Sequence, residues 1–167
     1  MIICLDVDYR AGRAAAGGLL IKDWEDRRPA KELVRACEEP AEYRPGRFYL
    51  RELPPLLALI GSLTDLPETA VIDGYVWLGK NREPGLGAYL YRRLEEKIAV
   101  VGVAKNPFRD REPALSVYRG ESKKPLFVTA AGMEPEKAAA AVGRMAGDFR
   151  TPDILKKVDR LCRTAVI

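Results

Sequence analysis

Apolar residues occur along the chain in short clusters separated by polar turns that contain Gly or Pro, a pattern typical of alternating strands and helices. Residues 2–8 are mostly apolar and predict a buried central strand. Further strands are expected at residues 14–22, 31–37, 69–73, 98–104, 114–119 and 125–130. Short turns between the first three favour an antiparallel meander.

Helices are predicted where apolar residues recur at the spacing of helical turns. Leu86, Leu90 and Leu94 have this spacing and indicate a helix over residues 84–97. The other helices are expected at residues 52–63, at residues 134–147 with Gly147 at the end, and from Thr151 onward. Pro54 and Pro55 are assigned to a first helical turn after a short extended segment that ends at Leu50, and Thr151 to an N-cap.

This order of elements predicts an α/β fold, a ribonuclease H-like mixed β-sheet flanked by helices. A length of 167 residues suits one domain that spans residues 1–167. An apolar content of 47% beside 31% charged residues is typical of a globular protein.

Composition narrows the possible chemistry. Histidine is absent, which excludes His-based triads, His acid–base catalysis and His metal ligands. Cys4, Cys37 and Cys162 have no CxxC spacing and are interpreted as buried thiols in a reducing compartment. Gln is absent and only Asn81 and Asn106 carry a side-chain amide, which suggests a thermophilic source.

The net charge of +4 and the pI of about 9.0 permit a nucleic-acid partner without requiring one. The apolar run over residues 53–60 is too short to span a bilayer, and no secretory signal is recognised, so we expect no membrane partner and a cytoplasmic location. A monomer is expected.

Three carboxylates at strand ends are the main candidates for chemistry. Asp6 follows the apolar run of residues 2–5, Glu52 follows Tyr49-Leu50-Arg51, and Asp73 ends the run of residues 70–72. An acid within or beside an apolar strand is costly unless it is compensated, and three acids together would repel one another without a cation. Oxygen-only clusters suit Mg²⁺ or Mn²⁺, and such ions catalyse displacement at phosphorus. We therefore expect a metal-dependent phosphodiesterase.

Other candidates surround these acids. Tyr43, Pro45 and Gly46 form a turn that is either a surface loop or a rigid aromatic element presented to a base. Lys105 lies just beyond the strand at residues 98–104, where it either enters solvent or faces a phosphate. Arg92 and Arg93 are interpreted mainly as a solvated helix face.

In order along the chain, these pieces resemble the endonuclease V family of inosine-directed nucleases. The matching pieces are Leu5-Asp6-Val7-Asp8-Tyr9, Tyr43-Arg44-Pro45-Gly46, Arg51-Glu52, Asp73-Gly74, Gly102-Val103-Ala104-Lys105, Lys124-Pro125-Leu126-Phe127-Val128-Thr129 and Phe149-Arg150-Thr151-Pro152.

The resemblance implies a Mg²⁺-dependent cut, with Mn²⁺ as a substitute, one nucleotide 3′ to hypoxanthine in DNA or RNA. It implies that Asp6, Glu52 and Asp73 bind the metal and that Lys105 approaches the phosphate. Tyr43 would wedge into the stack beside Pro45. Gly46 and Gly74 would line the base pocket, and we add Gly85 as a further candidate for its lining.

The chain also departs from this family. Family members carry His-Pro-Arg soon after Asp-Gly, whereas residues 75–84 here are longer and lack histidine. Glu134 or Glu136 is a candidate replacement for a histidine or acid near the last strand. Three alternatives therefore stay open: a same-fold nuclease of different specificity, a catalytically impaired nucleic-acid-binding module, and a small-molecule hydrolase.

Overall fold

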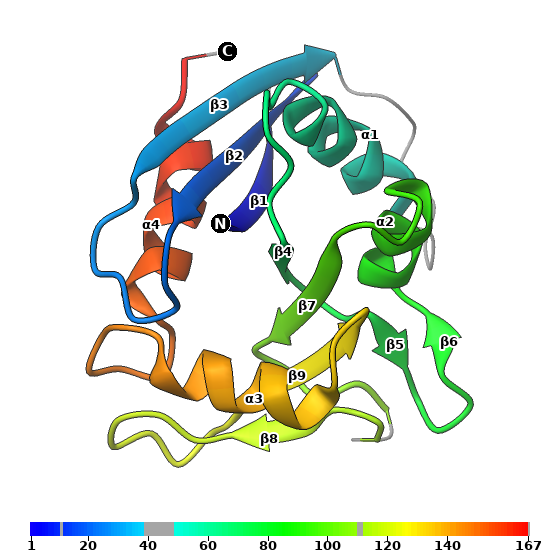
Figure 1. Ribbon diagram of the computed structural model, residues 1–167, viewed down its shortest axis with the longest axis vertical. Coiled ribbons are helices and arrows are strands. Elements are labelled where there is room, and N and C mark those ends of the chain that lie inside the picture. Colours follow the sequence, from blue (N-terminus) through cyan, green and yellow to red (C-terminus); the bar gives the residue numbers. More distant parts are fainter. Residues whose placement is uncertain (11, 39–48, 110–111, 167) are drawn as a thin grey trace.

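A mixed seven-stranded sheet forms the centre of the molecule (Figure 1). The computed structural model describes residues 1–10, 12–38, 49–109 and 112–166. The strands lie in the order β3-β2-β1-β4-β7-β9-β8. Their bounds are β1 (Ile2–Arg10), β2 (Arg13–Ile21), β3 (Lys31–Glu38), β4 (Thr69–Asp73), β7 (Ala99–Ala104), β8 (Leu115–Val117) and β9 (Leu126–Ala131).

The pairing directions follow the lengths of the connections. β1, β2 and β3 pair antiparallel through short turns, as the predicted meander requires. β4 pairs parallel with both β1 and β7, after connections that contain a helix. The expected ribonuclease H-like α/β fold is confirmed.

In the described part of the chain, two helices cover each face of the sheet. Their bounds are α1 (Tyr49–Ile60), α2 (Leu86–Arg93), α3 (Pro135–Arg144) and α4 (Asp153–Thr164). Ile3 and Leu5 of β1 join a buried cluster with residues of α1 and α2. Ile2 and Cys4 point to the opposite face, into a cluster that α3 and α4 complete. This alternation along β1 decides which helices each strand side chain meets.

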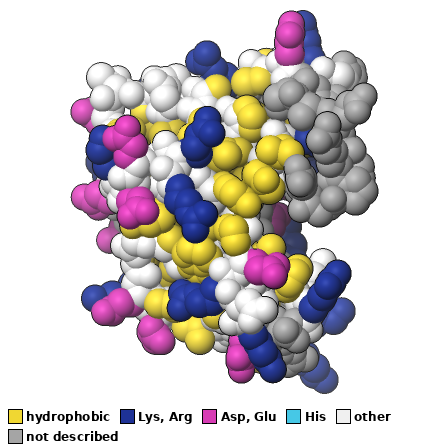
Figure 2. Space-filling view, turned by 90° about the vertical axis from the view of Figure 1, so that its right-hand side faces the viewer, with side chains coloured by type: hydrophobic (Ala, Val, Ile, Leu, Met, Phe, Trp, Pro, Cys, Tyr) yellow, Lys and Arg dark blue, Asp and Glu magenta, His cyan; other side chains and the backbone are white. Residues whose placement is uncertain are grey.

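The outer side of α1 and α2 is partly apolar. Partly buried hydrophobic residues there, including Leu86, Tyr89 and Tyr91, pack against the cluster that contains Ile3 and Leu5. Figure 2 shows a band of hydrophobic side chains down this side of the molecule, with Lys and Arg side chains across it. The face is therefore not uniformly charged. Among the described residues, no helix is long and apolar enough to cross a membrane.

The expected position of the first helix was wrong at both ends. α1 begins at Tyr49 and ends at Ile60, so Tyr49 and Leu50 are helical and not extended. Pro54 and Pro55 consequently lie in the helix interior and not in its first turn. Burial of Leu53, Leu56 and Leu59 against the sheet outweighs the loss of hydrogen bonds that two prolines impose.

The segment before α2 contains structure that the sequence did not reveal. β5 (Trp77–Leu78) and β6 (Glu83–Pro84) form a hairpin. The Trp77 Nε1–H donates to the Ala130 carbonyl at 2.9 Å, which fixes the hairpin to β9. α2 starts only at Leu86 and ends at Arg93, because Glu95 and Glu96 adopt positive φ.

Two further helix ends differ from expectation. α3 ends at Arg144, before Gly147. Pro152 occupies the N-cap position of α4, and no side chain caps that helix. Thr151 is therefore not the N-cap.

Candidate active site

Strand register brings Asp6 and Asp73 to the same face and the same level of the sheet. β1 and β4 are parallel neighbours in which Cys4 pairs with Val71 and Leu5 pairs with Ile72. Extending this register by one residue puts Asp6 beside Asp73. Cys4 and Val71 both point toward α4, so the acids two residues further along do the same.

Asp6 is a largely buried carboxyl group. Burial, and then the negative charges of Asp73 and Asp159, raise the pKa of Asp6 to about 6, although the backbone N–H of Val7 donates to its Oδ1 at 2.9 Å. A carboxyl that loses water and faces other carboxylates holds its proton more tightly. Negative charge thus concentrates around Asp6 at neutral pH.

Glu52 reaches this edge of the sheet from the opposite layer, in the first turn of α1. Burial, followed by the charges of Asp6 and Asp73, raises its pKa to about 7. The three predicted acids therefore lie close enough to act on one another, although they come from three separate elements.

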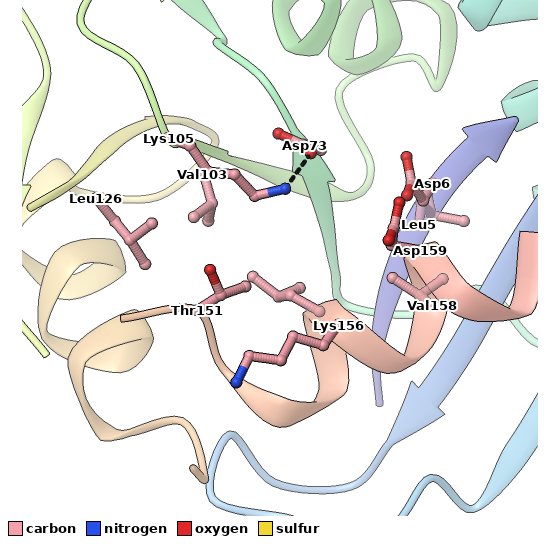
Figure 3. A pocket seen from close by; sticks show the side chains of 11 residues that line it. Leu5, Asp6, Asp73, Val103, Lys105, Leu126, Thr151, Lys156, Val158 and Asp159 are labelled. Atoms are coloured by element: carbon pink, nitrogen blue, oxygen red, sulfur yellow. Dashed lines mark hydrogen bonds and ion pairs between the residues drawn. The ribbon is translucent and has the colours of Figure 1, made fainter. Parts of the chain in front are cut away.

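Asp159 is a fourth acid that the sequence reasoning missed. It lies on α4 next to Val158, which is buried against the sheet. Asp159 lines a cavity of about 130 Å³ together with Asp6, Asp73 and Lys105, and Figure 3 shows its carboxylate beside that of Asp6. Its only signal in the sequence is an acid that borders the apolar stripe Ile154, Val158 and Cys162.

Lys105 contacts one of the predicted acids directly. Its Nζ lies 3.1 Å from Asp73 Oδ2, and both side chains are about half exposed (48% each). Figure 3 shows the ammonium extending across the cavity to Asp73. The lysine thus provides part of the positive charge that the acids require, from a position where solvent can replace it.

A second cavity, of about 480 Å³, opens on the other side of Asp73. Its lining includes Glu52, Asp73, the aromatic side chains of Tyr75 and Phe108, and the predicted Gly74 and Gly85. The Tyr75 hydroxyl donates to the Asn106 carbonyl at 2.6 Å and accepts from the Phe108 N–H at 3.0 Å, so this wall is fixed by hydrogen bonds.

Gly85 allows the backbone to pass close to Tyr75 in this wall. A Cβ there would lie 2.5 Å from the Tyr75 carbonyl oxygen, so no larger residue fits without a shift of the backbone. Gly74 has φ of 133°, a conformation that residues with a side chain rarely adopt.

The donor set suits a hard divalent cation in its chemistry. Asp6, Asp73 and Asp159 line the first cavity, and Glu52 lies close enough to feel the charges of Asp6 and Asp73. Oxygen ligands are those that Mg²⁺ and Mn²⁺ prefer. As placed, no three acid or thiol groups of the described residues already lie close enough together to hold an ion. Binding of an ion by three of these groups would therefore require some of their side chains to rotate.

Other predicted residues lie elsewhere. Tyr43, Pro45 and Gly46 fall outside the described residues. Glu134 pairs with Lys137 at 3.2 Å and is 69% exposed, and neither Glu134 nor Glu136 lines either cavity. These two glutamates therefore lie apart from the other acids, whereas Asp159 lies among them.

A family model and a curated relative both match this chain to endonuclease V. The family model described as Endonuclease V matches residues 1–124. The endonuclease V of Streptomyces avermitilis is 28% identical over 155 residues, which cover 81% of this chain and 66% of that protein. The chain thus spans about two thirds of the length of this curated relative.

Solved structures agree with the sequence relationship. The crystal structure of the Streptomyces avermitilis endonuclease V superposes with a TM-score of 0.75 at 25% identity, covering 97% of this chain and 79% of that one. The endonuclease V of Ciona intestinalis, solved with a 24mer DNA containing an inosine followed by a ribo-adenosine, superposes with a TM-score of 0.77 at 18% identity, covering 97% and 84%. The residues matched, the shared fold and the acids at its edge lead to one conclusion: the chain belongs to the endonuclease V family.

Proposed function

We propose that the protein is a metal-dependent endonuclease that hydrolyses a phosphodiester bond 3′ to a deaminated base, hypoxanthine, in DNA or RNA, as in the repair of deaminated DNA. The observation that carries the proposal is the pair Asp6 and Asp73, adjacent on parallel strands with Glu52 and Asp159 beside them. Family membership supports the reaction class, and the inosine-containing DNA bound by the Ciona protein supports the substrate.

Asp6, Glu52 and Asp73 would hold Mg²⁺, or Mn²⁺ in its place, with Asp159 as an additional oxygen donor. When bound, such an ion stabilises negative charge on the phosphoryl oxygens and lowers the pKa of a water molecule. The burial that raises the pKa of Asp6 and Glu52 also gives each carboxylate little water to lose on binding a cation.

Lys105 has two roles in this scheme. In the absence of substrate its ammonium neutralises Asp73. Lys105 also lines the cavity, where its ammonium would face the scissile phosphate and stabilise the charge that develops there.

The second cavity would receive the extruded base. It adjoins Asp73 and Glu52, and its aromatic wall of Tyr75 and Phe108 offers ring surface to a purine. Tyr43, with Pro45 and Gly46, would fill the gap that the base leaves, as the family resemblance implies.

Cleavage of an oligonucleotide with a single inosine, in the presence of Mg²⁺, tests the proposal. Wild-type protein is expected to cut on the 3′ side of inosine, and Asp73→Asn to lose at least about 10²-fold in rate because the metal site loses a charge. Asp65→Asn, a change of an exposed loop acid, is the matched control and should cut normally. Equal rates for wild type and Asp73→Asn would refute the proposal.

A same-fold nuclease of different specificity is the second candidate, favoured by the β5–β6 hairpin. Leu78 and Glu83 of this hairpin line the second cavity. They belong to residues 75–84, the segment that lacks the His-Pro-Arg of the family. Cleavage of inosine, abasic, flap and RNA substrates under one condition separates the two candidates. Preference for a substrate without inosine would favour this second function.

A further inference from the structure

Phe149 is a large apolar side chain that the core does not use. It lies between α3 and α4, in the segment that precedes α4, and 67% of it is exposed. An exposed aromatic ring of this kind either occupies solvent without function or meets a partner.

The loop that carries Phe149 is held by a buried arginine. Arg119 is only 6% exposed, and its guanidinium donates to the main-chain carbonyls of Phe149 at 2.9 Å, of Gly147 at 3.1 Å and of Met145. Gly120 allows this approach, because a Cβ there would overlap the Asp148 carbonyl. The ring is thus presented from a fixed backbone, which reduces the entropy lost when it binds a partner.

Lys156 links this ring to the candidate active site. Its Nζ lies 4.3 Å from the centroid of the Phe149 ring. The same lysine lines the cavity that contains Asp6 and Asp73 (Figure 3). The Lys156 side chain therefore borders both that cavity and the Phe149 ring.

The hollow beside Phe149 has the chemistry to accept a base. It measures about 610 Å³ and is lined by Phe149, Arg150, Ser122 and the acids Glu121 and Asp148. Carboxylates accept hydrogen bonds from the amino and imino groups of bases and repel phosphate. The arrangement thus orients a base toward the hollow and its phosphate toward Lys156.

We propose that Phe149 is a stacking platform for an unpaired base of the substrate strand and that Lys156 binds a neighbouring phosphate of that strand. The occupant is a single-stranded segment of nucleic acid that flanks the cut, since ring stacking combined with a lysine beside the backbone is the general mode of single-strand binding. This inference rests on the proposed function.

Fluorescence of 2-aminopurine tests the platform without requiring cleavage. A single-stranded inosine oligonucleotide carries the probe at successive positions around the inosine, in buffer with EDTA so that the strand stays intact. Wild-type protein is expected to quench the probe strongly at one flanking position. Phe149→Ala should abolish that quenching and weaken binding about 5-fold to 150-fold, since a stacked base contributes about 1–3 kcal/mol.

Two further variants make the result specific. Phe149→Trp keeps an aromatic surface and should retain both the affinity and the quenching. Leu66→Ala, at an exposed apolar residue in the loop before β4, is the matched control and should leave both unchanged.

Quenching and affinity that stay the same in Phe149→Ala, or wild-type protein that quenches the probe at no position, would overturn the platform. Normal inosine cleavage with an unaffected Phe149→Ala would remove this inference and leave the proposed function intact. Position-specific quenching by a wild-type protein that does not cut would support the Phe149 platform and contradict the proposed cleavage.

Discussion

At the scale of the residue, the protein places carboxyl groups where water cannot fully solvate them. Asp6 and Glu52 have pKa values raised to about 6 and about 7, first by burial and then by neighbouring carboxylates. Such groups destabilise the folded state once they ionise, unless a cation compensates them. That cost is expected in a site built to bind a metal.

The first prediction follows from the sign of these shifts. Folded Asp6 and Glu52 bind protons more tightly than their ordinary pKa values of 3.8 and 4.5 allow in the unfolded chain. Their contribution to stability is complete below those ordinary values and is lost as pH rises through about 6 and about 7. The metal-free Tm should therefore fall between about pH 4 and about pH 7, and Mg²⁺ should raise it more at the upper end of this range.

Scanning calorimetry at several pH values, with and without Mg²⁺, measures this effect. Glu52→Gln removes one of the titrating groups and should flatten the pH dependence. A variant slope as steep as that of wild type would contradict the assignment.

The second prediction concerns Lys105. Lys105→Met removes the ammonium that contacts Asp73 at 3.1 Å. The cleavage rate should fall about 10²-fold because charge on the phosphate loses a partner, while Mn²⁺ affinity should stay equal or rise because a competing cation is gone. Single-turnover kinetics and Mn²⁺ titration together check both parts. Loss of metal affinity in this variant would contradict this role and would show that Lys105 instead holds Asp73 in position for metal binding.

At the scale of the element, the contact between β2 and α4 places Asp159. Gly17 of β2 lies so close to α4 that a Cβ there would be 2.5 Å from Cys162 Sγ. The Cys162 thiol donates to the Asp6 carbonyl at 3.2 Å, so this helix also touches the strand that carries the first acid. Small residues in the strand thus bring a helix-borne carboxylate into the site.

Gly17→Ala is the third prediction. The added methyl should displace α4 and cost about 1–3 kcal/mol in the free energy of unfolding, as overpacked cores do. Cleavage should fall further than stability alone explains, since Asp159 moves with the helix. Gly143→Ala, on the exposed side of α3, is the control and should be neutral or stabilising by about 0.5–1 kcal/mol.

Urea unfolding and cleavage rates at a temperature where both variants are folded separate these effects. Normal cleavage by folded Gly17→Ala would show that the position of Asp159 does not matter to the reaction.

At the scale of the whole molecule, the sequence predicted the strands better than the ends of the helices. A short apolar run such as residues 70–72 is buried on both sides when it forms a central strand, so β4 lies where it was expected. The start of α1 was not predictable from Pro54 and Pro55, because tertiary burial outweighs their local preference. Asp159 was missed because strand register and helix packing, which local patterns do not encode, bring it beside Asp6.

The fourth prediction also belongs to this scale. If the protein acts on nucleic acid as proposed, a net charge of +4 predicts that binding involves several separate phosphate contacts. Binding of a single strand in EDTA should weaken steeply with salt, and Lys156→Ala should reduce the slope of log K against log salt by about one. Fluorescence anisotropy at several KCl concentrations measures the slope. An unchanged slope would remove Lys156 from the phosphate-binding surface.

The most direct test of the central claim is a crystal structure of the protein soaked in Mn²⁺, with anomalous diffraction recorded near the manganese edge. The account predicts an anomalous peak bounded by carboxylate oxygens of Asp6, Glu52 and Asp73, with the Lys105 ammonium moved away from Asp73. A map without manganese at these acids, with Lys105 still in contact with Asp73, would contradict it.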